Sequence, residues 1–442
     1  MGCSSSMEQL LALSAMPSSA MSDAARQLAA FSLFDWLVCA RAGADQELSR
    51  IMRDFVREEG GKPVATIVGE GDKYPARAAA LANGTISHAL DYDDTHFAHI
   101  GHLSVGIYPA ALAVGEETNA SAIETRDAFL TGAEAACRIG MVLGRVHYQR
   151  GFHQTATAGA IGATVAAGRL HRLTTNQMRN ALSLVATRAS GLKSQFGTMG
   201  KPFNAGIAAA NGVEAANFAK RGFVSCEDGI AGAQGFVATH SDGPDTESAW
   251  LEPPPQRWIF EDNKYKLHAC CHGTHAMIEA LRDAMDQRRF SADELNCVTV
   301  FTHPRWLKVC DIKEPRTGLE VKFSYVHLAA MVVSGIDTSS DKIYTASLAG
   351  NEDLRKLADC VEVVGDETLG DMAARVVIRF EADKGIEVSH DLASHLPLDV
   401  LEKGLRSKAS GLLGADPAEK LWASVSALDR LSAGELAALL IR

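Results

Sequence analysis

Hydrophobic positions in the first part of the chain recur at the spacing of an α-helix. Segment 23–43 shows this pattern, with Leu28, Phe31 and Phe34 among its apolar side chains. Side chains three or four positions apart lie on one face of a helix, so the pattern predicts an amphipathic helix here. Gly43 closes the segment and is a typical helix stop.

Further helical segments follow, and they are rich in alanine and glycine. The predicted helices cover residues 76–90, 108–117, 126–144, 155–170, 174–190 and 204–223. Small side chains let helix backbones approach closely, so these segments predict a compact bundle with buried central helices. Glycine weakens an isolated helix, and tight packing must offset that cost. No GxGxxG motif follows a predicted strand, so a dinucleotide-binding domain is not supported.

The pattern changes at the proline-rich stretch 242–258. Beyond it, β-branched and alternating runs bounded by turn residues predict strands at 297–303, 360–366, 374–382 and 385–391. Helical patterns at 274–287 and 323–335 lie among them, and helix returns from 397 onward. The predicted fold is mainly α: a large all-helical domain (1–255 and 397–442) and a smaller α+β lid domain (256–396) with an antiparallel sheet.

Composition narrows the class of protein. The 442 residues carry 43 basic and 54 acidic side chains, a net charge of -11, which argues against a nucleic-acid partner. Nine cysteines without a CxxC pair are typical of reduced thiols in the cytoplasm. No apolar run reaches membrane-spanning length, and no secretory signal is recognised. The opening residues 1–16 faintly resemble an acylation signal but are better explained as a poorly ordered leader.

Residues 88–106, HALDYDDTHFAHIGHLSVG, concentrate four histidines and three aspartates. Three interpretations compete: a metal site, an acid–base site without metal, or a polar loop without a chemical role. His96, His99 and His102 are three apart, a spacing that could place metal ligands on one helical face. The HExxH pattern is absent, however, and Gly101 with the residues after it indicates a loop, so the metal interpretation is the weaker one.

Residues suited to acid–base chemistry also occur elsewhere in the chain. Histidine exchanges protons near neutral pH, and a neighbouring aspartate can fix its tautomer. His153 stands just before a small-residue helix, where the helix dipole favours an anion. Lys201 lies in a glycine-flanked loop, also before a helix, and would supply positive charge inside an acidic protein. The run at 263–280, NKYKLHACCHGTHAMIEA, adds lysines and histidines at the entry to the second domain.

Each of these residues also has an ordinary structural explanation. His153 could cap a helix, and Lys201 could be a solvated surface lysine, the commoner fate of a lysine. The aspartates of the histidine-rich segment could be turn residues. From the residues alone, an acid–base enzyme and a non-enzymatic protein remain equally supported.

The combination of motifs resembles the MmgE/PrpD family. The matching landmarks are HALDYDDTH, GFHQTATAGAIGA, FGTMGKPFNAGIAAANGVEAA, KLHACCHGTHAMIEA and VKFSYVHLAAMVV, in this order between about residues 20 and 440. The family includes 2-methylcitrate dehydratase, cis-aconitate decarboxylase and iminodisuccinate epimerase. The resemblance implies a helical domain built from both ends of the chain, a homodimer, and chemistry on small di- and tricarboxylates with neither metal nor cofactor.

The resemblance also implies the site residues. By motif, the family's catalytic residues fall on Asp91, Thr95, His102, His153 and Lys201. Substrate-binding residues from the lid fall on Lys266, Cys271, His275, Tyr325 and His327. Two departures stand out. His327 occupies the place of a family tyrosine, with Tyr325 two residues earlier, and the spacing from Asp91 to His102 is one residue longer than in the decarboxylase pattern.

The resulting expectation is a lyase that moves a proton at a carbon next to a carboxylate. Lys201 would offset the growing negative charge, while one of His102 and His153 acts as base and the other as acid or orienting donor. Asp91 and Thr95 would hold a histidine and a carboxylate oxygen. The alternatives are an epimerase of an amino-dicarboxylate such as iminodisuccinate, a metal-dependent hydrolase, and a non-catalytic carboxylate-binding relative.

Overall fold

The computed structural model describes residues 5–380 and 385–441. They divide into two compact units, unit 1 (Met1–Tyr265 and Asp416–Arg442) and unit 2 (Lys266–Ala415). Unit 1 is helical apart from one short strand pair, and unit 2 combines helices with a sheet, which confirms the mainly α fold class. The division differs from the predicted borders, because residues 256–265 group with unit 1 and 397–415 with unit 2.

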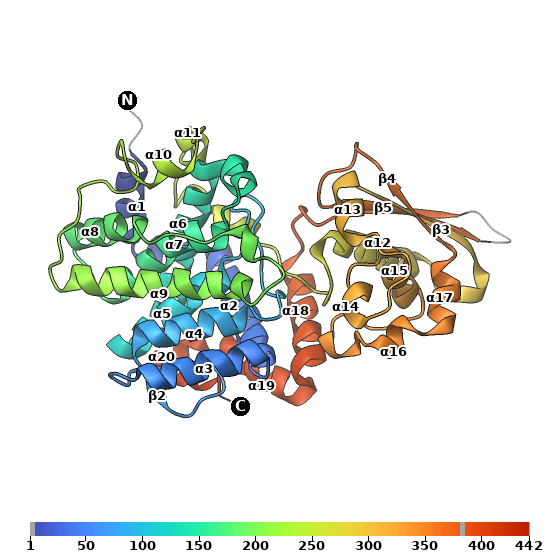
Figure 1. Ribbon diagram of the computed structural model, residues 1–442, viewed down its shortest axis with the longest axis horizontal. Helices are drawn as coiled ribbons and strands as arrows, with labels where there is room; N and C mark the ends of the chain where they lie inside the picture. Colours follow the sequence, from blue (N-terminus) through green and yellow to red (C-terminus); the bar gives the residue numbers. More distant parts are fainter. Residues whose placement is uncertain (1–4, 381–384, 442) are drawn as a thin grey trace. The chain divides into compact units, whose positions relative to one another are not determined.

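Unit 1 is a helix bundle in which three central helices, α5, α7 and α9, pack side by side (Figure 1). Its longer helices are α1 (Ser6–Ser14), α2 (Asp23–Gly43), α3 (Glu47–Glu59), α4 (Ala76–Ser87), α5 (Ser104–Thr118), α6 (Ala122–Arg150), α7 (Gln154–Leu170), α8 (Thr175–Ala186), α9 (Gly200–Lys220) and α19 (Ala415–Ser426). Shorter elements are α10 (Phe236–His240), α11 (Thr246–Ala249), α20 (Ala433–Ala438) and the antiparallel strands β1 (Ala65–Thr66) and β2 (Lys73–Tyr74).

Glycines bring these helices into backbone contact, as the small-residue pattern predicts. A Cβ atom built on Gly132 of α6 would lie 2.5 Å from the carbonyl oxygen of Gly162 in α7, and the reverse holds for Gly162. A Cβ atom on Gly84 of α4 would lie 2.8 Å from Cα of Gly206 in α9. No side chain fits at such distances, so glycine is required where these helices cross.

The expectation of a poorly ordered leader is wrong for the part of it that the structure describes. Ser6–Ser14 forms helix α1, and Met7 and Leu10 are fully buried. Ser5 caps the helix by accepting a hydrogen bond from the backbone N–H of Glu8. Residues 1–4 lie outside the described part of the chain.

Unit 2 contains a four-stranded sheet in the order β4-β3-β5-β6. Its elements are α12 (His275–Gln287), β3 (Leu295–Thr302), α13 (Leu307–Cys310), α14 (Gly318–Val321), α15 (Tyr325–Val333), α16 (Ala346–Ala349), α17 (Glu352–Ala358), β4 (Val361–Gly365), β5 (Ala373–Phe380), β6 (Ile386–Asp391) and α18 (Leu398–Leu413). Helices α12 and α15 pack against each other and against the sheet (Figure 1).

All four predicted strands are present, but the sheet is mixed rather than wholly antiparallel. Strand β3 pairs antiparallel with β5, and β5 with β6, whereas β3 and β4 run parallel. The chain between β3 and β4 passes through several helices, which gives it the length that a parallel crossover needs. In the described residues, no helix combines the length and apolarity needed to cross a bilayer.

Candidate active site

The histidine-rich segment forms an irregular loop between α4 and α5, and Asp94 anchors it. The fully buried Asp94 carboxylate accepts hydrogen bonds from the backbone N–H (3.1 Å) and hydroxyl (2.6 Å) of Ser104, the first residue of α5. It also accepts from the side-chain amide of Asn263 at 2.7 Å. Burial raises the pKa of Asp94, because the charged form loses its hydration. Its bonds fix where the loop turns into the helix.

Two of the four histidines in this loop are structural. His96 donates from Nε2 to the carbonyl of Ile259 at 2.8 Å, and His99 donates from Nδ1 to the carbonyl of Ala136 at 3.1 Å. Burial lowers the pKa of His99 to about 3, so its ring is neutral. Because these rings face carbonyl groups of other segments, the three histidines His96, His99 and His102 do not form the helical metal triad that their spacing would allow.

The other charged side chains of the loop form one chain of contacts that ends at Lys201. Nδ1 of His102 lies 2.8 Å from Oδ2 of Asp93, and Nε2 of the same ring lies 3.4 Å from Oδ1 of Asp91. The second oxygen of Asp91 lies 2.6 Å from the Lys201 ammonium. Asp91 thus joins an imidazole and an ammonium group, and its side chain is still 47% exposed.

Lys201 lies in the first turn of α9 rather than in a loop before the helix, which corrects the sequence expectation. Its side chain is only 16% exposed, so it is not a solvated surface lysine. The ammonium lies 5.1 Å from the centre of the Phe196 ring, a cation–π distance. The same ring packs edge-on against His153 at 4.9 Å between centroids. Phe196 therefore contacts both Lys201 and His153, so these two side chains lie near each other.

His153 is held as a neutral hydrogen-bond donor by Asn204. The Asn204 amide nitrogen donates to the carbonyl of Leu192 (3.2 Å), a group that can only accept, and its second N–H reaches Nδ1 of His153 at 3.1 Å. Nδ1 must then be an acceptor, which places the ring proton on Nε2. Burial, with smaller contributions from His88, His102 and Lys201, holds the pKa of His153 well below its ordinary value.

Three helices begin at this cluster. His102 precedes α5 by two residues, His153 immediately precedes α7, and Lys201 lies in the first turn of α9. The backbone N–H groups and positive dipole ends of helices attract anions at their N-termini. Together with Lys201, they give this side of an acidic molecule a local preference for negative charge.

Thr95 is the one predicted catalytic residue whose side chain has no visible partner. Its backbone pairs with Lys264 in both directions, at 2.7 and 2.8 Å. Its hydroxyl is buried without a hydrogen-bond partner in the described part of the chain. The proposed role of Thr95 in holding a carboxylate oxygen stays a prediction.

The side chains of His88, Asp91, Asp93 and His102 lie close enough to suggest a metal centre, with candidate ligand atoms within 4.8 Å of one another. The contacts inside the cluster are those of hydrogen bonds and ion pairs. Nδ1 of His88 is 2.7 Å from Oδ1 of Asp93, whereas two ligands of one zinc ion are about 3.3 Å apart. The Lys201 ammonium on Asp91 would also repel a divalent cation. In this arrangement the four side chains form a network of hydrogen bonds and ion pairs, and metal independence stays a prediction.

Tyr325 and His327 of unit 2, both predicted to bind substrate, are buried. Tyr325 donates to the carbonyl of Gly273 at 2.7 Å and contacts the Thr302 hydroxyl at 3.0 Å. His327, two positions along α15, lies near Arg355 and the backbone of Ala349 instead. Residues two apart on a helix point about 200° apart, so the two rings face different surroundings.

The remaining predicted residues of unit 2 lie before and at the start of α12. His275 is its first residue, and its ring packs 4.8 Å from that of His272 and 5.0 Å from that of His268. Cys271 is half-buried with its thiol beside that of Cys310, and Lys266 is buried. That these side chains bind substrate stays a prediction.

Sequence reasoning missed three residues of the network: His88, Asp93 and Asn204. The first two lie in the segment that was singled out for its titratable groups. Asn204 follows Lys201 by three positions, the spacing of one helical turn, so extending α9 backward to Gly200 would have placed both on one face.

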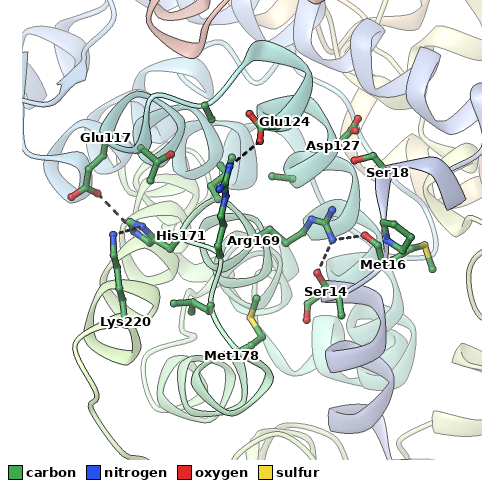
Figure 2. A pocket seen from close by; sticks show the side chains of 18 of the residues that line it. Ser14, Met16, Ser18, Glu117, Glu124, Asp127, Arg169, His171, Met178 and Lys220 are labelled. Carbon is green, nitrogen blue, oxygen red and sulfur yellow. Dashed lines mark hydrogen bonds and ion pairs between the residues drawn. The ribbon is translucent and has the colours of Figure 1, made fainter.

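A cavity of about 760 Å³ lies elsewhere in unit 1, lined in part by residues at the C-terminal ends of α5, α7 and α9 (Figure 2). Its basic groups are engaged by neighbouring residues. Lys220 contacts Nδ1 of His171 at 3.1 Å, and Arg169 donates to the carbonyls of Ser14 and Met16. Helix α7 alone separates the two ends by about 25 Å, so this cavity is distinct from the histidine cluster.

The fold and the cluster together define a protein that brings imidazoles, carboxylates and an ammonium to the N-termini of buried helices, where an anion is favoured. Residues 13–249 match the MmgE/PrpD N-terminal domain and residues 268–413 the MmgE/PrpD C-terminal domain. The chain belongs to the MmgE/PrpD family.

Curated relatives are similar over different shares of the chain. The cis-aconitate decarboxylase-like protein oryM of Aspergillus oryzae is 24% identical over 434 residues, covering 91% of this chain and 90% of that protein. A cis-aconitate decarboxylase of Aspergillus terreus is 28% identical over 275 residues, covering 59% and 56%. The cis-aconitate decarboxylase of Homo sapiens is 25% identical over 222 residues, covering 48% and 45%.

Proposed function

We propose that the protein is a metal-independent lyase of the dehydratase or decarboxylase type, acting on a small di- or tricarboxylate. One observation carries the proposal. Lys201 is joined through Asp91 to His102, and both Lys201 and His102 lie where buried helices begin. The family and the cis-aconitate decarboxylase relatives support the same class of reaction.

The contacts suggest a role for each group. A substrate carboxylate would bind near Lys201 and the helix N-termini, in reach of the half-exposed Asp91. His102, with a carboxylate on each side, is the proton carrier, because its ring lies between the buried Asp93 and the half-exposed Asp91. His153 is held with Nε2–H available and would donate to a substrate oxygen.

Two balanced outcomes follow from these roles. In dehydration, His102 takes the proton next to the carboxylate, Lys201 stabilises the resulting anion, and the hydroxyl group leaves as water with a proton from an acid. In decarboxylation, the C–C bond breaks, carbon dioxide leaves, and the remaining carbanion takes a proton from His102. Both need the same positive environment and differ in the leaving group.

Hydrogen exchange tests this proposal. The purified protein is incubated in deuterated water with 2-methylcitrate, citrate, cis-aconitate and iminodisuccinate, and proton NMR follows exchange and product formation. We expect water loss or decarboxylation from at least one tricarboxylate. If the protein only exchanges hydrogen on iminodisuccinate and inverts its configuration, the lyase proposal is wrong and the protein is an epimerase. If no compound exchanges hydrogen, an enzymatic role is contradicted.

Metal independence needs a separate measurement. We expect full turnover after dialysis against EDTA, with less than one equivalent of zinc or iron per chain by elemental analysis. Activity that is lost on chelation and restored by a single divalent ion would overturn this part of the proposal.

We further propose that the protein is a homodimer, as its family resemblance implies. Apolar side chains that are more than 40% exposed lie along and just before α9, among them Met199, Phe203 and Phe218. Burying them against a second copy would remove apolar surface from water. Sedimentation equilibrium should give twice the mass of one chain, and the mass of a single chain at micromolar concentration would contradict the proposal.

A further inference from the structure

Two histidines of the loop between α4 and α5 share one buried aspartate. Nδ1 of His88 lies 2.7 Å from Oδ1 of Asp93, and Nδ1 of His102 lies 2.8 Å from Oδ2. The His88 and Asp93 side chains are 0% exposed, so water does not compete for these contacts. The two rings meet edge to face, with 4.5 Å between centroids. One carboxylate therefore fixes the position of both imidazoles.

The protonation of this trio follows from its chemistry. Burial alone would raise the pKa of Asp93, but His102 and His88 more than offset it and hold this pKa well below its ordinary value. An ionised carboxylate can only accept hydrogen bonds, so each Nδ1 that faces it must carry a proton. The contact of His102 with Oδ2 is bent away from ideal hydrogen-bond geometry, but its length is that of a close ion pair.

The two nitrogens of His102 face different surroundings. Nδ1 faces the buried Asp93, whereas Nε2 faces Asp91, whose side chain is 47% exposed. A substrate that approaches Lys201 and Asp91 can meet only Nε2. Proton exchange with the substrate therefore takes place at Nε2.

We propose that Asp93 is a positioning residue that keeps a proton on Nδ1 of His102 and presents Nε2 to the substrate, and that His88 locks Asp93 in the required orientation. The kinetic consequence rests on the proposed lyase function, but the tautomer is a property of the substrate-free protein. A third member of the loop serves as a matched control. Asp94 is equally buried and adjacent, but its carboxylate binds Ser104 and Asn263 and no histidine.

The direct test is the tautomer itself, read from nitrogen-15 NMR of histidine-labelled protein without substrate. We expect Nδ1–H for His102 and His88 in the wild type, with His102 assigned by comparison with His102→Asn. Asp93→Asn should abolish the preference, and Asp94→Asn should keep it. A wild-type His102 with its single proton on Nε2 would overturn the proposal, and this measurement decides even if Asp93→Asn does not fold.

Steady-state kinetics give a second measurement, which would not change in the expected way if Asp93 were only structural. Asp93→Asn should lower kcat by about 10²- to 10⁴-fold with little change in KM, since Asp93 does not reach substrate. The substitution also removes a negative charge 2.8 Å from the His102 ring, so the pH profile of kcat should shift. Charged and titratable groups that face His102 are Asp91, Asp93, His88, His99, His153 and Lys201.

The outcomes separate the two proposals. Asp94→Asn should reduce the denaturation midpoint without shifting the pH profile. An unshifted profile in a folded Asp93→Asn enzyme would contradict the positioning role, while the lyase function would stand. If the wild type turns over none of the polycarboxylates, the function fails and the NMR result still decides the tautomer.

Discussion

His102 differs from the other histidines of its loop in what its ring contacts. His96 and His99 bind carbonyl groups and serve the fold, whereas His102 lies between the carboxylates of Asp91 and Asp93. At the scale of single residues, the role of a side chain in the site thus depends on the groups that it contacts more than on its residue type. The same holds for Lys201, which Asp91 and Phe196 hold in place.

Substitution of Lys201 tests the charge of the site. Lys201→Ala should lower kcat/KM by at least about 10²–10³-fold, because it removes the ammonium that offsets negative charge on the substrate. Lys220→Ala is the matched control, since Lys220 ends the same helix and contacts His171 instead. Steady-state rates near wild type in a folded Lys201→Ala protein would contradict the site.

Substitution of Asn204 tests whether the tautomer of His153 matters for activity. Asn204→Ala removes the donor that fixes the tautomer of His153, and we expect kcat to fall by about tenfold to a hundredfold. Asn211→Ala is matched to it, because Asn211 lies two turns further along α9 and bonds to Arg188 rather than to a histidine. Both variants should lose some stability, but only Asn204→Ala should lose activity. Equal kcat values would show that the tautomer does not matter.

At the scale of elements, the site is the meeting point of helix N-termini. The close contact of the loop with α7 sets the position of His102, whose backbone N–H donates to the Thr155 hydroxyl at 2.9 Å. Gly101 permits this contact, since a Cβ atom there would lie 2.8 Å from the backbone nitrogen of Thr155. The loop and the helix can approach only because that position has no side chain.

Gly101→Ala should therefore displace His102 from α7. We expect a destabilisation of about 1–3 kcal/mol from overpacking, together with a loss of kcat/KM. Gly106→Ala is the control, because a Cβ atom on Gly106 meets nothing nearer than 3.4 Å. Thermal melting and steady-state kinetics of the two variants provide the measurement. A fully active and equally stable Gly101→Ala would show that the loop adapts.

At the scale of the whole molecule, buried neutral histidines make stability depend on pH. Burial lowers the pKa values of His147 and His171 to about 4, from an ordinary value of 6.5. Between pH 6.5 and 4 the unfolded chain binds protons at these rings that the folded chain does not. Stability is thus fully present above pH 6.5 and is lost as the pH falls toward 4.

The urea concentration at the midpoint of unfolding should accordingly decrease when the pH is lowered from 7 to 5. Circular dichroism at a series of pH values measures it. His171→Gln removes one of these groups and should flatten the dependence. A midpoint that stays constant or rises toward pH 5 would contradict the burial of these rings as neutral groups.

The sequence by itself determined the helical unit, the four strands of the second unit and the loop that carries the histidines. These features follow from local periodicity and from glycine placement, which act over a few residues. It also singled out the histidine-rich segment with His102, as well as His153 and Lys201, and the family resemblance added their catalytic roles, which stay predictions. The orientation of strand β4 escaped prediction, because strand direction depends on how a long connection folds back.

Only the tertiary structure decided which histidines of one loop serve the fold and which face Lys201. The carbonyl that engages His96 lies 163 residues away, and the amide that fixes His153 lies 51 residues away. Ring partners at such separations are brought together by helix packing, which no local pattern encodes. The tautomers, and with them the roles of the rings, follow from those partners.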